Sequence, residues 1–195
     1  MRFPVPVGDP RHGTCPACTA PTVDVEPSLR PALPEAGANV EGRTVGVLDN
    51  IRSAMNVGTM LRAADGARVD HLYLAGLSPA GDHPKVAKTA LGAERTVTWS
   101  HVPDAVTTVT DLKARGTVIW AFEVTNRAVP FDEVDQVPEE VAVVVGNERS
   151  GVDPGVLRLA DRHISLPMAG AKTTLNVGVA FGVAIYGIRS IRART

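Results

Sequence analysis

The chain has 195 residues, a length that fits one ordinary domain with enough core to fold without disulfides or metals. Its 44% hydrophobic and 21% charged residues exclude a disordered or fibrous protein. The formal net charge of -1 provides no overall positive field, so any nucleic acid would have to bind a local patch or a concave site.

Residues 1–40 differ in composition from the remainder of the chain. Eight of the fifteen prolines fall between Pro4 and Pro34, and each removes a backbone donor and disfavours helix before it. We therefore predict a mostly irregular, Pro-rich arm over 1–40 and one folded domain over 41–195. Cys15 and Cys18 lie in this arm, and with His12 they make at most part of a zinc site, so no metal site is predicted.

Short apolar runs alternate with helical patterns from Arg43 onwards. The patterns predict strands over 44–48, 70–75, 96–99, 117–122, 141–145 and 163–166, and helices over 56–69, 86–91, 104–115, 154–160 and 175–192. Asp153 is a candidate N-cap of the fourth helix, and Thr173 or Thr174 of the last. This alternation predicts an α/β fold with a largely parallel sheet flanked by helices.

Several features favour a cytoplasmic protein. Cysteines are confined to the first twenty residues, so the main body holds no disulfide, as in a reducing compartment. The N-terminus lacks the apolar segment of a signal peptide. The apolar run over 175–188 is interrupted by Gly178, Gly182 and Gly187 and is too short for a bilayer, so no membrane partner is predicted.

Three unusual loops follow predicted strands, at 49–58, after 141–145 and after 163–166. Because the carboxyl ends of parallel strands meet at one edge, these loops predict a shared pocket. Gly146 and Gly151 bracket a turn that allows close backbone approach, which suits an adenosine better than a pyrophosphate. The chain has no Gly-x-Gly-x-x-Gly after the first strand and no Walker-type Gly-Lys-Ser/Thr, which disfavours a dinucleotide or nucleoside triphosphate.

The polar residues of these loops allow both a functional and a purely structural interpretation. Glu148 is either a solvated surface carboxylate or the partner of a partly buried Arg62. Asn176 would fall in the first turn of the last helix, where it has poor helix propensity and no capping role, so it is expected to turn towards the pocket.

Three signatures follow one another along the chain: Asn56-x-Gly58-x-x-x-Arg62, Gly146-x-Glu148-x-x-Gly151 after an apolar strand, and Leu166-Pro167-Met168-x-Gly170 followed by Leu175-Asn176-Val177. Together they resemble the SpoU (TrmH-like) branch of the SPOUT RNA methyltransferases. The resemblance covers about residues 43–190. It implies an enzyme that transfers a methyl group from S-adenosylmethionine to a ribose 2′-hydroxyl of tRNA or rRNA. It also implies a C-terminal trefoil knot and a homodimer with the site near the interface.

The resemblance also assigns site residues. The implied catalytic residues are Asn56, Arg62, Glu148, Thr174 and Asn176, and the implied cofactor-binding residues are Val145, Gly146, Asn147, Gly151, Ile164, Leu166, Met168 and Leu175. The family commonly has serine where Thr174 stands; threonine keeps the hydroxyl but is stiffer at χ1.

In the family that the chain resembles, the arginine at the position of Arg62 is often described as the catalytic base. A guanidinium, however, stays protonated in proteins. We therefore expect Arg62 to bind an RNA phosphate or to stabilise the developing alkoxide, with Glu148 and Asn56 positioning the reactants. A catalytically lapsed RNA-binding protein and methylation of a base nitrogen are the alternatives. Gly178 and Gly182, four residues apart, are consistent with the dimer, and candidate phosphate contacts are Arg52, Lys85, Lys88, Arg95, Arg127, Arg149 and Lys172.

Overall fold

The computed structural model describes residues 13–15, 18–21 and 41–194. The chain divides into two units, Met1–Asn39 and Val40–Thr195. In the first unit, Thr14 and Pro21 form an antiparallel bridge, and the Cys15 backbone N–H donates to the Ala20 carbonyl at 2.9 Å. The remainder of the predicted arm, including His12, lies outside the described residues.

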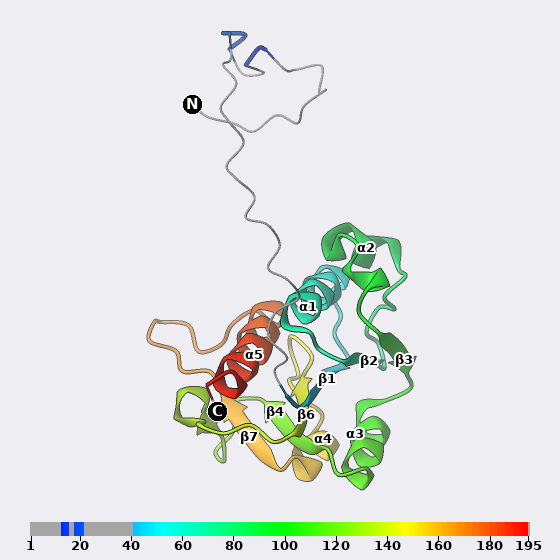
Figure 1. Cartoon of the computed structure of the whole chain (residues 1–195), viewed down its shortest axis with the longest axis vertical. Helices are drawn as coiled ribbons and strands as arrows, with labels where there is room; N and C mark the ends of the chain where they lie inside the picture. The colour runs from blue at the N-terminus through cyan, green and yellow to red at the C-terminus, as the bar shows by residue number, and fades with distance from the viewer. Residues whose placement is uncertain (1–12, 16–17, 22–40, 195) are drawn as a thin grey trace. The chain divides into compact units, whose positions relative to one another are not determined.

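The second unit is built on a parallel sheet (Figure 1). Its strands are β1 (Arg43–Asp49), β2 (His71–Ala75), β3 (Trp99–Val102), β4 (Val118–Phe122), β5 (Val129–Pro130), β6 (Glu140–Val145) and β7 (Arg162–Ser165). The order across the sheet is β3-β2-β1-β6-β4-β7-β5, and each pairing is parallel. The predicted largely parallel sheet is therefore confirmed.

Helices cover both faces of the sheet. They are α1 (Ala54–Ala67), α2 (Pro84–Ala90), α3 (Ala105–Ala114), α4 (Pro154–Leu159) and α5 (Val177–Arg192), with 3₁₀ turns η1 (Ala93–Arg95) and η2 (Phe131–Glu133). Helices α1 and α5 lie over one face of the sheet, with α2 packed against α1, and α3 and α4 lie over the other face (Figure 1). No helix within the described ranges is long and apolar enough to cross a membrane.

Two separate cores follow from the alternation of side chains along the strands. In β6, Val141, Val143 and Val145 join the core beneath α1 and α5, while Ala142 and Val144 join the core above α3 and α4. This explains why the strand is apolar throughout, as a strand covered on both faces must be. At Gly46 in β1, a Cβ would lie 2.4 Å from Leu72 Cδ2 and 3.1 Å from Phe181 Cε2, so a larger residue would force these core side chains to move.

Some predicted boundaries were wrong. The third strand was expected over 96–99, but β3 spans Trp99–Val102, because 93–95 form a 3₁₀ turn that Thr96 closes. The Val97 N–H bonds to the Ala93 carbonyl at 2.9 Å instead of entering the sheet. The first helix begins at Ala54, two residues earlier than predicted, because the Ser53 side chain caps it. The predicted Asp153 cap is confirmed: its side chain accepts from the Gly155 N–H.

Candidate functional site

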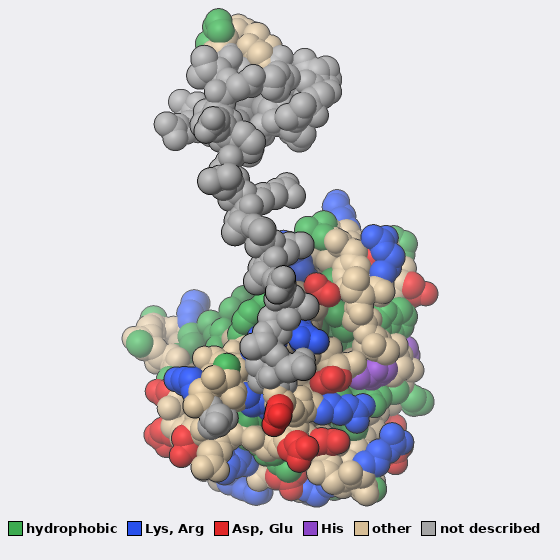
Figure 2. All heavy atoms as spheres, viewed as in Figure 1, with side chains coloured by type: hydrophobic (Ala, Val, Ile, Leu, Met, Phe, Trp, Pro, Cys, Tyr) green, Lys and Arg blue, Asp and Glu red, His purple; other side chains and the backbone are tan. Residues whose placement is uncertain are grey.

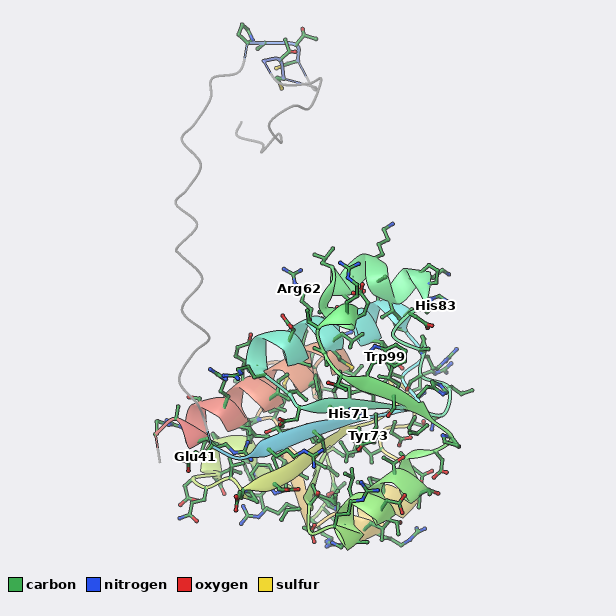
Figure 3. The ribbon with its side chains drawn as sticks, turned by 45° about the vertical axis from the view of Figure 1, so that its right-hand side comes forward. Glu41, Arg62, His71, Tyr73, His83 and Trp99 are labelled. Carbon is green, nitrogen blue, oxygen red and sulfur yellow. The ribbon has the colours of Figure 1, made fainter. Side chains whose placement is uncertain are left out.

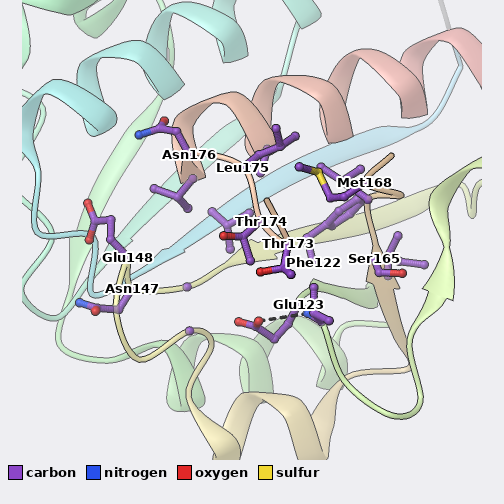
Figure 4. A pocket seen from close by; sticks show the side chains of 18 of the residues that line it. Phe122, Glu123, Asn147, Glu148, Ser165, Met168, Thr173, Thr174, Leu175 and Asn176 are labelled. Atoms are coloured by element: carbon purple, nitrogen blue, oxygen red, sulfur yellow. Dashed lines mark hydrogen bonds between the residues drawn. The ribbon is translucent and has the colours of Figure 1, made fainter. Parts of the chain in front are cut away.

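A pocket of about 450 Å³ opens at the carboxyl edge of the sheet, a volume typical of small-molecule sites (Figure 4). Its walls come from the ends of β4, β6 and β7 and from the start of α5. All eight predicted cofactor-binding residues line it: Val145, Gly146, Asn147, Gly151, Ile164, Leu166, Met168 and Leu175. Glu148, Thr174 and Asn176 also line it, whereas Asn56 and Arg62 do not.

Glu148 fastens the loop after β6 to the loop after β1. Its carboxylate accepts from the Arg52 N–H at 3.0 Å, the Ser53 N–H at 3.1 Å and the Asn56 Nδ2 at 2.9 Å. Burial alone would raise the pKa of this carboxyl, but hydrogen bonds from Arg52, from its own backbone N–H, from Asn56 and from Ser53 together lower it. Glu148 is exposed at the surface, yet its carboxylate clamps the two loops together.

Asp49, at the end of β1, makes a second connection between these loops. Its carboxylate accepts from the Asn50 amide at 2.8 Å and from the Asp153 N–H at 2.7 Å, while the Asn147 amide donates to the Asn50 carbonyl at 2.7 Å. Burial is the main cause that raises the pKa of Asp49. The folded protein therefore holds the Asp49 proton to a higher pH than the unfolded chain does. The stability that this proton contributes is lost as pH rises from 3.8, the ordinary pKa of Asp, through the raised pKa.

Asn176 is the N-cap of α5, which corrects the prediction that a threonine would cap this helix. Its Oδ1 accepts from the Gly178 N–H at 2.9 Å and the Val179 N–H at 3.3 Å, so α5 begins at Val177. The expectation that Asn176 has no capping role is therefore wrong. Its Nδ2 donates to Asn56 Oδ1 at 3.2 Å, so one amide both starts the helix and joins the polar network.

Arg62 does not pair with Glu148 within the subunit. Its side chain is exposed and extends from α1 on the side away from the sheet (Figure 3), and none of the ion pairs found among the described residues includes it. The prediction of a partly buried guanidinium held by Glu148 is wrong, because backbone N–H groups and Asn56 already occupy that carboxylate.

The glycines of α5 face a helix of the same chain. A Cβ on Gly178 would lie 3.6 Å from Thr59 Cγ2, and one on Gly182 would lie 3.8 Å from Ala63 Cβ. A Cβ at these distances would make ordinary van der Waals contacts with α1. The two glycines therefore face a helix of their own chain and give no independent support for a dimer, contrary to the expectation from their spacing.

Glu123 is a pocket residue that the sequence analysis missed. It directly follows β4, lines the pocket, and accepts from the Val152 N–H at 2.9 Å and the Val124 N–H at 3.0 Å (Figure 4). The strand before it was predicted, so the rule that ligands bind at the carboxyl ends of parallel strands would have found this fourth loop. Other pocket residues not assigned to the cofactor are Phe122, Val124, Arg149, Ser165, Thr173, Val177 and Ala180.

No cluster of three or more His, Cys, Asp or Glu suited to a metal ion occurs in the parts of the chain that the structure describes.

Together, the fold and the site define a class of protein: a parallel α/β domain with a small-molecule pocket at the sheet's carboxyl edge, beside an amide–carboxylate network. The chain belongs to the SpoU rRNA Methylase family, whose model matches residues 43–186. The resemblance drawn from the three sequence signatures is therefore confirmed.

Relatives of known name agree with this assignment. The 23S rRNA (guanosine(2553)-2'-O)-methyltransferase RlmP of Bacillus subtilis is 32% identical over 151 residues, covering 75% of this chain and 58% of that protein. The tRNA (guanosine(18)-2'-O)-methyltransferase of Aquifex aeolicus is 34% identical over 139 residues, covering 71% and 64%. The chain thus spans less than two thirds of the length of these two relatives.

Solved structures share the fold. The TrmH/SpoU tRNA modifying enzyme of A. aeolicus superposes with a TM-score of 0.70 at 29% identity, covering 80% of this chain and 79% of that one. An AdoMet-bound rRNA methyltransferase from Sinorhizobium meliloti gives a TM-score of 0.72 at 24% identity, covering 77% and 57%, and this likeness bears on the fold alone.

Proposed function

We propose that this protein transfers a methyl group from S-adenosylmethionine to a ribose 2′-hydroxyl of tRNA or rRNA. The observation that carries the proposal is the hydrogen-bonded series Asn176–Asn56–Glu148 beside a pocket lined by the predicted cofactor residues. The family membership and the named activities of the two relatives support it.

The pocket suits an adenosine with a short polar extension. Ile164, Leu166, Met168 and Leu175 provide apolar side chains for a base, and the carboxylate of Glu123 can accept hydrogen bonds from ribose hydroxyls. At Gly146, a Cβ would lie 2.2 Å from the Gly151 carbonyl carbon, so glycine lets the two ends of this pocket-lining turn approach each other closely. When bound, S-adenosylmethionine supplies an electrophilic methyl group to the acceptor hydroxyl.

The network next to the pocket fixes a single orientation of Asn56. Its Nδ2 donates to Glu148 and its Oδ1 accepts from Asn176, so both ends of the amide are held. Such fixed polar groups lower the cost of aligning an RNA ribose with the methyl donor. We assign Glu148, Asn56 and Asn176 to this positioning, and Thr174 to the wall of the pocket nearest them.

A two-fold dimer would bring Arg62 to an active site. Exposed residues form a stripe on α1 (Met55, Thr59, Arg62 and Gly66) and a mainly apolar stripe on α5 (Val179, Val183 and Tyr186). The two stripes adjoin, because α1 and α5 pack side by side. Burying this apolar surface would favour a homodimer, and Arg62 lies on the same surface. We propose that it acts on the partner's RNA, binding a phosphate or the developing alkoxide.

Mixing two severely impaired variants tests this arrangement. Arg62→Ala and Glu148→Ala are each expected to keep only about 1% of wild-type activity alone. After subunit exchange, half of the dimers are mixed and each regains one intact site, so about a quarter of wild-type activity should return. Failure of the mixture to regain activity, when native mass spectrometry shows that mixed dimers have formed, would mean that Arg62 does not act across the interface. Arg62→Lys should remain impaired, because it cannot make a bidentate contact.

The chemistry itself is tested with total RNA from a strain that lacks the protein. Incubation with methyl-labelled S-adenosylmethionine, nuclease digestion and nucleoside analysis should give a 2′-O-methylnucleoside. A base-methylated nucleoside would favour the base-nitrogen alternative. Absence of cofactor binding by isothermal titration would favour the lapsed RNA-binding protein.

We also propose the trefoil knot that the resemblance implies. It is supported by the path of the chain: β7 pairs beyond β4, yet α5 returns to contact α1, β6 and β4. Pulling a single unfolded chain from both ends should give a length shorter than the contour length, because a tightened knot retains residues. A length equal to the full contour, near 3.3–3.6 Å per residue, would exclude the knot.

A further inference from the structure

We propose that Arg52, Arg127, Arg149 and Lys172 form a cationic rim around the pocket that holds RNA phosphates independently of base sequence. This inference rests on the proposed function, because it concerns how the same site receives its RNA. The four side chains come from the four loops that follow β1, β4, β6 and β7.

Each loop carries its cation close to the pocket. Arg149 lines the pocket, and Lys172 immediately precedes the lining residue Thr173. Arg127 lies three residues after the lining residue Val124, and the backbone of Arg52 is bonded to Glu148. Four loops that are distant in sequence therefore bring one basic residue each to the same edge of the sheet.

Acidic and basic residues of these loops differ in what they bind. The acids are Asp49, Glu123, Glu148 and Asp153, and each accepts at least one hydrogen bond from a backbone N–H of the loops or of α4. The four rim side chains are exposed, and no ion pair or side-chain hydrogen bond holds them within the described part of the chain. The carboxylates thus turn inward to build the site while the cations remain available.

This difference allows a protein of net charge -1 to bind a polyanion at one place. Figure 2 shows Lys, Arg, Asp and Glu intermingled over the visible face, without a broad basic surface. Exposed, unpaired Arg and Lys side chains are suited to phosphate oxygens, and such contacts orient RNA without reading its bases. The rim would therefore place the RNA backbone around the pocket, while the pocket and its polar network select the ribose.

The test measures binding of unfractionated bacterial tRNA as a function of salt. Because phosphate contacts are independent of sequence, the probe need not be the true substrate. In the variant Arg52→Gln/Arg127→Gln/Arg149→Gln/Lys172→Gln, the slope of log K against log salt should decrease by about 3, at roughly 0.7 to 0.9 per lost contact. Affinity near physiological salt should fall on the order of 100-fold.

A matched pair isolates the position of the charges. Arg52→Gln/Arg149→Gln should reduce the slope by about 1.5, whereas Arg115→Gln/Arg158→Gln should leave it unchanged. Arg115 and Arg158 are exposed and precede β4 and β7, so they lie at the opposite edge of the sheet. Equal effects of the two pairs, or a wild-type slope in the fourfold variant, would overturn the rim.

Two further measurements distinguish an RNA-binding rim from a cofactor contact and from a contact between copies of the chain. Titration with S-adenosylmethionine should be unchanged in Arg52→Gln/Arg127→Gln/Lys172→Gln, which keeps the pocket residue Arg149, and loss of cofactor binding there would assign these residues to the pocket instead. Sedimentation should show the wild-type oligomeric state, and a change would assign the rim to contact between copies of the chain. Absence of cofactor binding in the wild type would refute the proposed function and leave the rim to be decided by the salt series.

Discussion

Replacing Glu148 with alanine is expected to lower methyl transfer by about 100-fold, as loss of alignment at a reacting centre does. The change removes the acceptor for the Arg52 N–H, the Ser53 N–H and the Asn56 amide, so the loop after β1 loses its attachment to the loop after β6. Because these groups lie near the surface, water can replace the lost acceptor, and the free energy of unfolding should change by only about 1 kcal/mol. Single-turnover methylation and urea unfolding measure the two effects.

Glu133→Ala is the matched control, since Glu133 is an exposed carboxylate in η2 outside the pocket. It should leave both quantities unchanged. Glu148→Gln should give an intermediate loss, because its amide would place a donor opposite another donor. The lowered pKa of Glu148 also predicts a pH dependence of stability. The ionised carboxylate stabilises the fold fully above the ordinary pKa of Glu, and this stabilisation disappears as pH falls through the lowered pKa. Activity of Glu148→Ala close to wild type would show that the clamp has no part in catalysis.

Substitutions at Asn176 are expected to separate helix capping from catalysis. Asn176→Ala removes the cap of α5 and should cost about 1–2 kcal/mol of stability together with most of the activity. Asn176→Asp keeps an acceptor for the Gly178 and Val179 N–H groups and places a negative charge at a helix N-terminus, so stability should be retained. Its activity should still fall at least 10-fold, because the carboxylate faces Asn56 Oδ1 without a donor.

Thermal unfolding and single-turnover rates of the two variants make this comparison. Rotating the Asn56 amide cannot rescue Asn176→Asp, because its oxygen would then face Glu148. Equal activity of Asn176→Asp and wild type would contradict the proposed role of the Asn176–Asn56 bond and leave Asn176 as a cap only.

Much of the fold followed from the sequence for identifiable reasons. The apolar run 141–145 predicted a parallel strand covered on both faces, and it forms β6 at the centre of the sheet. Glycine-containing loops after predicted parallel strands implied a common pocket, and the eight residues assigned to the cofactor do line one. Their role in binding S-adenosylmethionine remains a prediction.

The errors arose where distant residues compete for the same partner. Opposite charge predicted that Glu148 pairs with Arg62. Instead, the carboxylate accepts hydrogen bonds from the backbone N–H groups of Arg52 and Ser53, which lie 96 and 95 residues away in sequence. The sequence predicted that Thr173 or Thr174 caps the last helix and that Asn176 does not. In the structure, the Asn176 side chain accepts from the Gly178 N–H and also donates to Asn56. Such choices depend on geometry that local propensity does not describe.

The parallel pairing of β1 with β6 has a consequence for folding kinetics. It joins Leu48 to Val145 and brings Arg52 within bonding distance of Glu148, a residue 96 positions away. Contacts of such large sequence separation form slowly, because closing the intervening loop costs entropy before any contact repays it. A partly folded chain that contained only β1, β2 and β3 would lack both the clamp and the pocket, because their residues lie further along the chain. The ability to bind the methyl donor should therefore arise late in folding, with completion of the sheet.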